Sequence, residues 1–154
     1  MKKSILKVLF VIIPLVSFIT VSDNNIKVVA EKRTSNVTYN LRHPMHSWEG
    51  VCKDVNAILL LNSSTRIIEQ VAVSIRVDAF NSGNPNRDSH ALEVLEALKY
   101  QKVTFTGSNI KASKDMLNVE GNLTFHGITK PITIKASRED FANKLIKMTI
   151  GLLT

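Results

Sequence analysis

Cysteine is almost absent from this chain, which contains one thiol, Cys52, in 154 residues. A single cysteine cannot form an intramolecular disulfide, so the fold must be stabilised by its own apolar core. The length suffices for one such domain and is too short for two. Cys52 is a poor candidate nucleophile, because its segment resembles a strand and no suitably placed His and Asx partners are visible.

Metal-binding and hydrolase signatures are missing as well. The four histidines are His43, His46, His90 and His126, and they form no HxH or HxxxH pair. His43 and His46 are expected on opposite faces of one strand. No GxSxG elbow is present, although a hydrolytic triad can assemble in three dimensions without one. We therefore expect no metal, no cofactor and no enzymatic activity, with a cryptic hydrolase as the least favoured alternative.

The N-terminal apolar run is too short to cross a bilayer, at about 14 residues against the ~20 that a helix needs. Lys2, Lys3 and Lys7 precede or begin this run, which is the layout of a secretory signal peptide. We predict a signal peptide over residues 1–22, with cleavage after Ser22 or as late as Ala30. A retained anchor helix is the alternative, and no cysteine lies near either site to carry a lipid anchor.

The charge of the chain lacks the pattern of a nucleic-acid-binding protein. The formal net charge is +7, and removal of residues 1–22 with their three lysines leaves 17 basic and 13 acidic residues, or +4. The lysines and arginines are scattered and form no stripe. We expect no nucleic-acid partner. Transient contact with an anionic membrane surface is a weaker alternative to an ordinary soluble surface.

Period-two alternation dominates the rest of the sequence. It is clearest from Ile67 to Val77, and it recurs around Val103, Leu117, Leu123 and Ile132. The predicted apolar face of the strand from Ile67 to Val77 consists of Ile67, Glu69, Val71, Val73, Ile75 and Val77. Polar connections are predicted at 62–65 and 113–115, and a short hairpin at 120–122. Strands joined this closely form an antiparallel meander, which tends to close into a barrel or pack as a sandwich.

One segment has helical periodicity instead. From Asp88 to Lys99 the apolar residues have the i, i+3, i+4, i+7 spacing of one helix face, and they are Ala91, Val94, Leu95 and Leu98. Asp88 or Ser89 is expected to cap the first turn. The adjacent pair Arg87-Asp88 could bind a polar head group, but a structural role as salt bridge and cap is favoured.

The ordered motifs of the chain resemble those of the YceI-like family, lipocalin-like exported bacterial proteins that bind polyisoprenoid chains. The matching segments are His43 or His46 followed by Gly50, Arg87-Asp88-Ser89-His90 before the helix, Lys99 to Phe105, and Gly121 to Pro131. Gln101 replaces a proline usual in the family. The resemblance covers residues 33–137, and its last motif is almost unbroken.

The resemblance implies an all-β, antiparallel lipocalin-like β-barrel over residues 33–154, with the short helix at about 88–99 covering the barrel mouth. It implies binding and carriage of an isoprenoid-tailed or similar amphiphilic lipid in the periplasm, without catalysis. The residues expected to line the apolar interior are Tyr39, Val73, Ile75, Leu92, Leu95, Phe105, Leu123 and Phe125. His126, Thr129 and Lys130 are expected to stabilise a strand–turn junction.

The C-terminus departs from the family pattern. Only 13 residues follow Glu139-Asp140-Phe141, so the closing strand of the barrel is expected to be shortened, with Leu145, Ile146, Met148 and Ile150. An incompletely closed barrel has an exposed edge, which is an aggregation risk, and it would hold a long ligand less completely. A homodimer is a further possible partner state. The competing function is a non-binding structural or partner-interaction module of the cell envelope, such as an accessory to a membrane redox protein.

Overall fold

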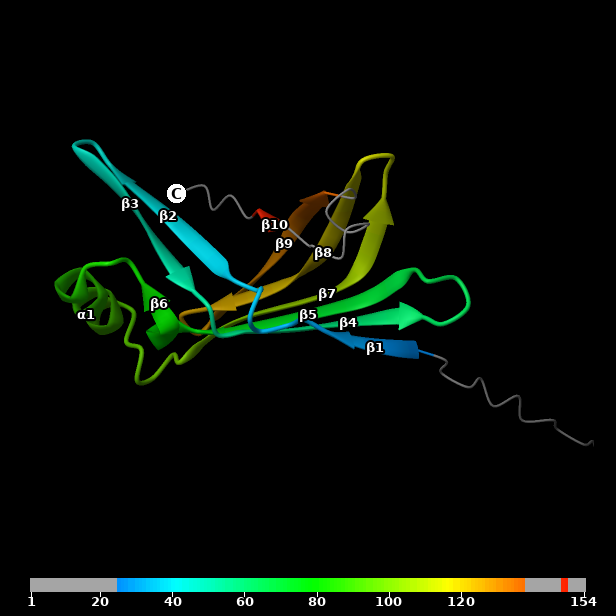
Figure 1. The fold of residues 1–154 in the computed structure, drawn as a ribbon, viewed down its shortest axis with the longest axis horizontal. Helices are drawn as coiled ribbons and strands as arrows, with labels where there is room; N and C mark the ends of the chain where they lie inside the picture. Colours follow the sequence, from blue (N-terminus) through cyan, green and yellow to red (C-terminus); the bar gives the residue numbers. More distant parts are fainter. Residues whose placement is uncertain (1–24, 138–147, 150–154) are drawn as a thin grey trace, which may run out of the picture.

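The computed structural model describes residues 25–137 and 148–149 (Figure 1). The strands are β1 Asn25–Val29, β2 Val37–His43, β3 His46–Cys52, β4 Val55–Asn62, β5 Ile68–Arg76, β6 Phe80–Asn81, β7 Lys102–Ala112, β8 Met116–Phe125, β9 Ile128–Ser137 and β10 Met148–Thr149. A 3₁₀ turn, η1, spans Val77–Ala79, and one helix, α1, spans Pro85–Val94. No helix in these ranges is long and apolar enough to cross a membrane.

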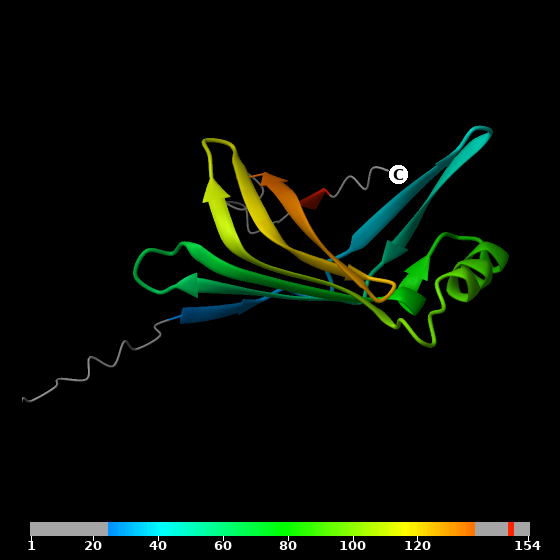
Figure 2. The same cartoon turned by 180° about the vertical axis from the view of Figure 1, so that it is seen from behind.

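The strands form two antiparallel sheets. The larger has the order β1-β4-β5-β7-β8-β9-β10 and the smaller the order β2-β3-β6. Figures 1 and 2 show the larger sheet strongly curved, with α1 and the β2–β3 hairpin at the same end. The predicted lipocalin-like antiparallel architecture with one short helix is confirmed. Within the described ranges the strand pairs form two sheets and do not join into one closed ring.

The larger sheet begins before residue 33, the expected start of the domain, and its last described strand lies within the expected limits. β1 lies before residue 33 and pairs with β4 over five residues. At the other end, Met148 and Thr149 pair with Ala136 and Lys135 of β9. Leu145, Ile146 and Ile150, the other residues of the expected closing strand, lie outside the described residues.

Two clusters of buried side chains form the core, and the larger lies across the central strands. Its members are Ile68, Val71, Phe105, Val119 and Ile134. The smaller cluster consists of Cys52, Val55 and Ile75. Val73 is half-buried and packs against both clusters. The core is therefore continuous along β5.

A β-bulge in β5 reverses part of the predicted apolar face. Leu60 pairs with Gln70 and Leu61 with Ile68, so Glu69 is an extra residue on this strand. Because a bulge shifts the alternation by one, Ile68 is buried whereas Ile67 is 60% exposed. The prediction is correct from Val71 onward and wrong for Ile67 and Glu69.

The predicted hairpin at 120–122 is also wrong, because β8 runs unbroken through these residues. Gly121 pairs with Gly107 of β7, next to a bulge at Ser108. A Cβ atom on Gly121 would lie 2.3 Å from the Thr106 carbonyl oxygen and 2.7 Å from both the Gly107 Cα and the Phe105 Cζ. The glycines permit a close approach of two backbones, with the Phe105 ring over them.

Two-residue turns join two of the strand pairs. His126 and Gly127 connect β8 to β9, and their φ angles of 49° and 73° correspond to a type I′ turn. Pro44 and Met45 connect β2 to β3, which makes His43 and His46 register partners on two strands. The expectation that these histidines lie on opposite faces of one strand is therefore wrong.

The helix is shorter than predicted and begins earlier. The Asn84 side chain accepts hydrogen bonds from the backbone N–H groups of Asn86 and Arg87, so Asn84 is the N-cap in place of Asp88 or Ser89. At the other end, Ala97 N–H donates to Leu92 O and Glu96 N–H to Glu93 O. These two bonds are a Schellman motif, which ends the helix at Val94.

We predict that Gly121→Ala lowers the free energy of unfolding by about 2 kcal/mol or more, because the added methyl group would overlap fixed backbone atoms. Urea denaturation followed by circular dichroism measures this change. Ser108→Ala, on the exposed bulge opposite, is the matched control and should change stability by less than about 0.5 kcal/mol. Equal midpoints for the two variants would contradict the close approach.

Candidate functional site

Four of the predicted interior residues lie together on β5, β7 and β8. Val73 pairs with Phe105, and Phe105 pairs with Leu123, so these three form one row across the sheet. Ile75 is next along β5 and pairs with Val103. Phe105 is 3% exposed and belongs to the core, whereas Val73 and Leu123 are only half-buried. The row therefore offers apolar surface that the protein itself leaves partly uncovered.

The other four predicted lining residues are dispersed. Tyr39 lies in the smaller sheet, opposite Gly50, with its ring centroid 5.3 Å from that of Phe80. Leu92 and Leu95 are half-buried at the C-terminal end of α1. Phe125 is 37% exposed beside the β8–β9 turn. The sequence pattern grouped these residues by apolar character, but they occupy three separate places.

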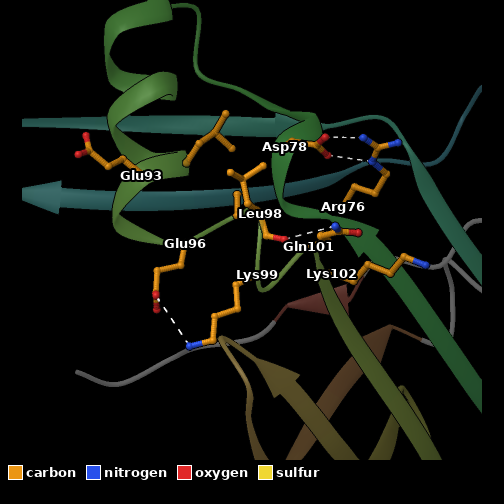
Figure 3. A pocket seen from close by; sticks show the side chains of 10 residues that line it. Arg76, Asp78, Glu93, Glu96, Leu98, Lys99, Gln101 and Lys102 are labelled. Atoms are coloured by element: carbon orange, nitrogen blue, oxygen red, sulfur yellow. Dashed lines mark hydrogen bonds and ion pairs between the residues drawn. The ribbon is translucent and has the colours of Figure 1, made fainter.

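An open groove of about 850 Å³ lies between the end of α1 and the start of β7 (Figure 3). Its lining residues are Arg76, Asp78, Leu92, Glu93, Glu96, Ala97, Leu98, Lys99, Gln101 and Lys102. Six of these ten side chains are charged, and three of the six are basic. Most of the exposed lining surface is nevertheless apolar, so the groove combines apolar walls with charged side-chain ends.

Ion pairs compensate much of the charge in this groove. Arg76 Nε donates to Asp78 Oδ1 at 2.8 Å, and a second guanidinium nitrogen donates to Oδ2 (Figure 3). The hydrogen bond from Arg76 lowers the pKa of Asp78 below its ordinary value. Lys99 Nζ lies 4.0 Å from Glu96 Oε1. Lys102 and Glu93 are the charged residues of the groove that lie outside these two pairs.

Glu96, Tyr100 and His126 form a junction between the loop after α1 and the β8–β9 turn. His126 Nε2 lies 3.1 Å from Glu96 Oε2, but the two atoms do not have the geometry of a hydrogen bond. The Tyr100 and His126 ring centroids are 4.4 Å apart. The Tyr100 ring also covers Gly127, where a Cβ atom would lie 2.6 Å from Cε1.

This junction gives a structural meaning to the motif around His126. Thr129 and Thr124 pair across the same hairpin, with their hydroxyl oxygens 2.8 Å apart. The predicted strand–turn role thus describes these residues well. The contribution of Glu96 was missed, because no sequence pattern signals that a glutamate just after a helix faces a turn that is distant in the sequence.

Arg87 and Asp88 each have a different structural role. The Arg87 guanidinium carbon lies 5.1 Å from the centroid of the Trp48 ring, a cation–π contact that holds α1 near β3. Both carboxylate oxygens of Asp88 accept from Ser82 N–H, at 3.1 and 3.2 Å, and so close the loop before the helix. The salt bridge and the cap expected of this pair are replaced by these contacts.

Groups that could do chemistry are sparse in the described ranges. Among residues 25–137, no three His, Cys, Asp or Glu side chains converge as metal ligands would. Cys52 has no exposed surface, and its thiol approaches the carbonyl oxygens of Asp54 and Arg76 at 3.7 and 3.9 Å. Burial raises the pKa of Cys52, which lowers its thiolate fraction. The thiol is packed as a core side chain.

A protein-family model for the YceI-like domain matches residues 29–151 of this chain. Curated relatives include the proteins called YceI from Salmonella newport and Salmonella arizonae, each 30% identical over 113 residues. The aligned part is 71% of this chain and 59% of each relative. The chain thus spans about six tenths of the length of these relatives.

Solved structures share the architecture. The crystal structure of Burkholderia cenocepacia BcnA aligns with a TM-score of 0.62 at 22% identity and covers 69% of both chains. The crystal structure of a Campylobacter jejuni YCEI protein aligns with a TM-score of 0.55 at 25% identity and covers 70% of this chain and 66% of that one. The identity to BcnA is low enough that this likeness concerns the fold alone.

We predict that Cys52 reacts with a thiol reagent at least about a hundredfold more slowly than an exposed cysteine, because it is reached only when the core opens. Ser108→Cys supplies the exposed control in the same chain. Because the folded thiol has the higher pKa, stability should decrease as the pH rises through the ordinary thiol range. Rapid labelling of Cys52 in the native protein would contradict its buried, unreactive state.

Proposed function

Because the chain belongs to the YceI-like family, we propose that it binds an isoprenoid-tailed or similar amphiphilic lipid and carries it in the periplasm without catalysis. The observation that carries this proposal is the half-buried apolar face beside the core. Its residues are Leu59, Leu61, Val73, Ile110, Leu117, Leu123 and Ile132. Covering this face with an apolar tail would stabilise the complex by roughly 25 cal/mol for each Å² removed from water.

The arrangement favours carriage over chemistry. The apolar face is built from strands, and the charged groove lies at the α1 end of the same curved sheet (Figures 1 and 3). A ligand with a long apolar tail and a small, weakly charged head group matches this division. Glu96 and His126 lie against each other where a loop meets a turn, and this position favours a structural role for both side chains over an acid–base role.

The lipid proposal predicts that Leu123→Glu removes the bound lipid. A charged group in the middle of the apolar face would weaken binding by at least about tenfold, since it loses the burial of one leucine and adds a buried charge. The measurement is lipid extraction and mass spectrometry of full-length protein purified from its exporting host. Circular dichroism accompanies it to establish that the variant is folded.

Two further variants make this test decisive. Ile67→Glu introduces the same charge on a 60% exposed side chain outside the apolar face and should retain the lipid. Leu123→Phe keeps the position apolar but fills space, so it should reduce the lipid without unfolding the protein. Native protein without stoichiometric lipid would refute carriage and favour a partner-interaction module. Turnover lost on replacing one histidine would favour a hydrolase.

We further propose that the chain is exported and processed after Ser22. Cleavage after Ala30 would remove β1, whose residues pair with β4 from Asn25 to Val29. It would also remove the hydrogen bond from Ala30 N–H to Ala57 O. Intact-mass measurement of protein from the periplasmic fraction should give a chain beginning at Asp23. A mass corresponding to a start at Glu31 would contradict this proposal.

A further inference from the structure

The loop after α1 holds an apolar side chain in water. Leu98 is 95% exposed, although it follows a helix whose neighbouring residues Leu92 and Leu95 are half-buried. Across the junction described above, the β8–β9 turn carries Phe125, 37% exposed, and Ile128, 58% exposed. We call Leu98, Phe125 and Ile128 the tip patch. It lies at the α1 end of the molecule, towards which the β2–β3 hairpin also points (Figures 1 and 2).

Unfavourable backbone conformations maintain this exposure. Glu96 and His126 have φ angles of 45° and 49°, in the left-handed region that glycine or asparagine normally occupies. Their side chains are the ones that meet at 3.1 Å. Glycine at residue 96 would relieve the strain of the Schellman motif but would lose this contact. The side chain of Glu96 therefore fixes the loop in the conformation that turns Leu98 outward.

The residues around the tip patch match a lipid surface. Lys99 is adjacent to Leu98, and Lys102 and Lys130 lie on the strands beside it, with no ion pair to another described residue for the latter two. Among the acidic side chains of the groove, Glu96 lies 4.0 Å from Lys99 and Asp78 pairs with Arg76, so exposed Glu93 is the one outside these two pairs. Long basic side chains beside a protruding leucine can reach phosphate groups while the leucine enters the acyl region.

A bilayer also fits the shape of this end better than a folded protein does. Met45, 87% exposed, lies at the tip of the β2–β3 hairpin, on a different element from Leu98. The hairpin tip and the loop after α1 project separately at this end (Figures 1 and 2), so they form no single continuous surface for a protein partner. A fluid lipid interface adapts to each tip independently. The chemistry and the shape therefore favour the same partner.

We propose that the α1 end of this protein docks on bilayers that contain anionic phospholipid, with Leu98 inserted at the boundary of the head groups and acyl chains. The neighbouring lysines contact the lipid phosphates. This docking does not depend on a bound isoprenoid, so it can hold or fail independently of carriage.

The test places an environment-sensitive NBD dye on Leu98→Cys in the full chain, where buried Cys52 does not compete for the label. Vesicles of phosphatidylcholine with phosphatidylglycerol should shift the emission to the blue and raise its intensity. The same dye on Ile67→Cys, 60% exposed at the opposite end of the sheet, should not respond. Vesicles of phosphatidylcholine alone should give a weaker response at residue 98.

Vesicle flotation supplies the second readout. Leu98→Asp should bind the mixed vesicles about tenfold less tightly than Ile67→Asp, since one leucine leaves the interface. Both variants share the same N-terminus, so any contribution of that segment cancels. Equal binding of the two variants, or no dye response at residue 98, would overturn the proposal. Ile128→Asp, which alters the tip patch at a residue outside the groove, should weaken flotation and leave the extracted lipid content unchanged, which separates docking from carriage.

Discussion

The seven-stranded sheet depends on the close approach of β7 and β8 at Gly107 and Gly121. Neither position has room for a side chain, because the Phe105 ring, the Val119 side chain and the facing backbone fill the space. Phe105 is 3% exposed and contributes to the larger core cluster. The same contact therefore sets the strand spacing and the position of the core. The bulge at Ser108 follows directly, since the ladder shifts register after the paired glycines.

An aromatic ring also packs on a glycine at two other contacts between elements of the fold. The Tyr39 ring lies over Gly50 and connects β2 to β3, and the Tyr100 ring lies over Gly127 and connects the α1 loop to the β8–β9 turn. At each site an added Cβ atom would lie under 3 Å from the aromatic ring. Several of the residues that identify the family are thus packing partners, and their spacing reflects ring-on-backbone contacts that a larger residue would prevent.

The sequence predicts the strands well because alternation reports directly which face is buried. It fails where one residue changes the alternation, as at Glu69, or where a glycine signals a close approach and not a turn, as at Gly121. The end of α1 was placed at Lys99, because apolar spacing continues through Leu98. The left-handed conformation of Glu96 ends the helix earlier, and its partner His126 is 30 residues away in the sequence. Local patterns carry no information about such a contact.

The interior row was easier to predict than the positions around it. Val73, Phe105 and Leu123 lie on adjacent strands in matching register, so alternation alone groups them. Tyr39, Leu92 and Leu95 depend on the placement of a second sheet and a helix, which alternation does not encode. The family motifs supply the ring-on-glycine contacts that position these elements. The apolar side chains between these contacts remain partly exposed. The proposed binding surface therefore consists of ordinary apolar residues, because the residues that identify the family hold the curved sheet and its loops in place.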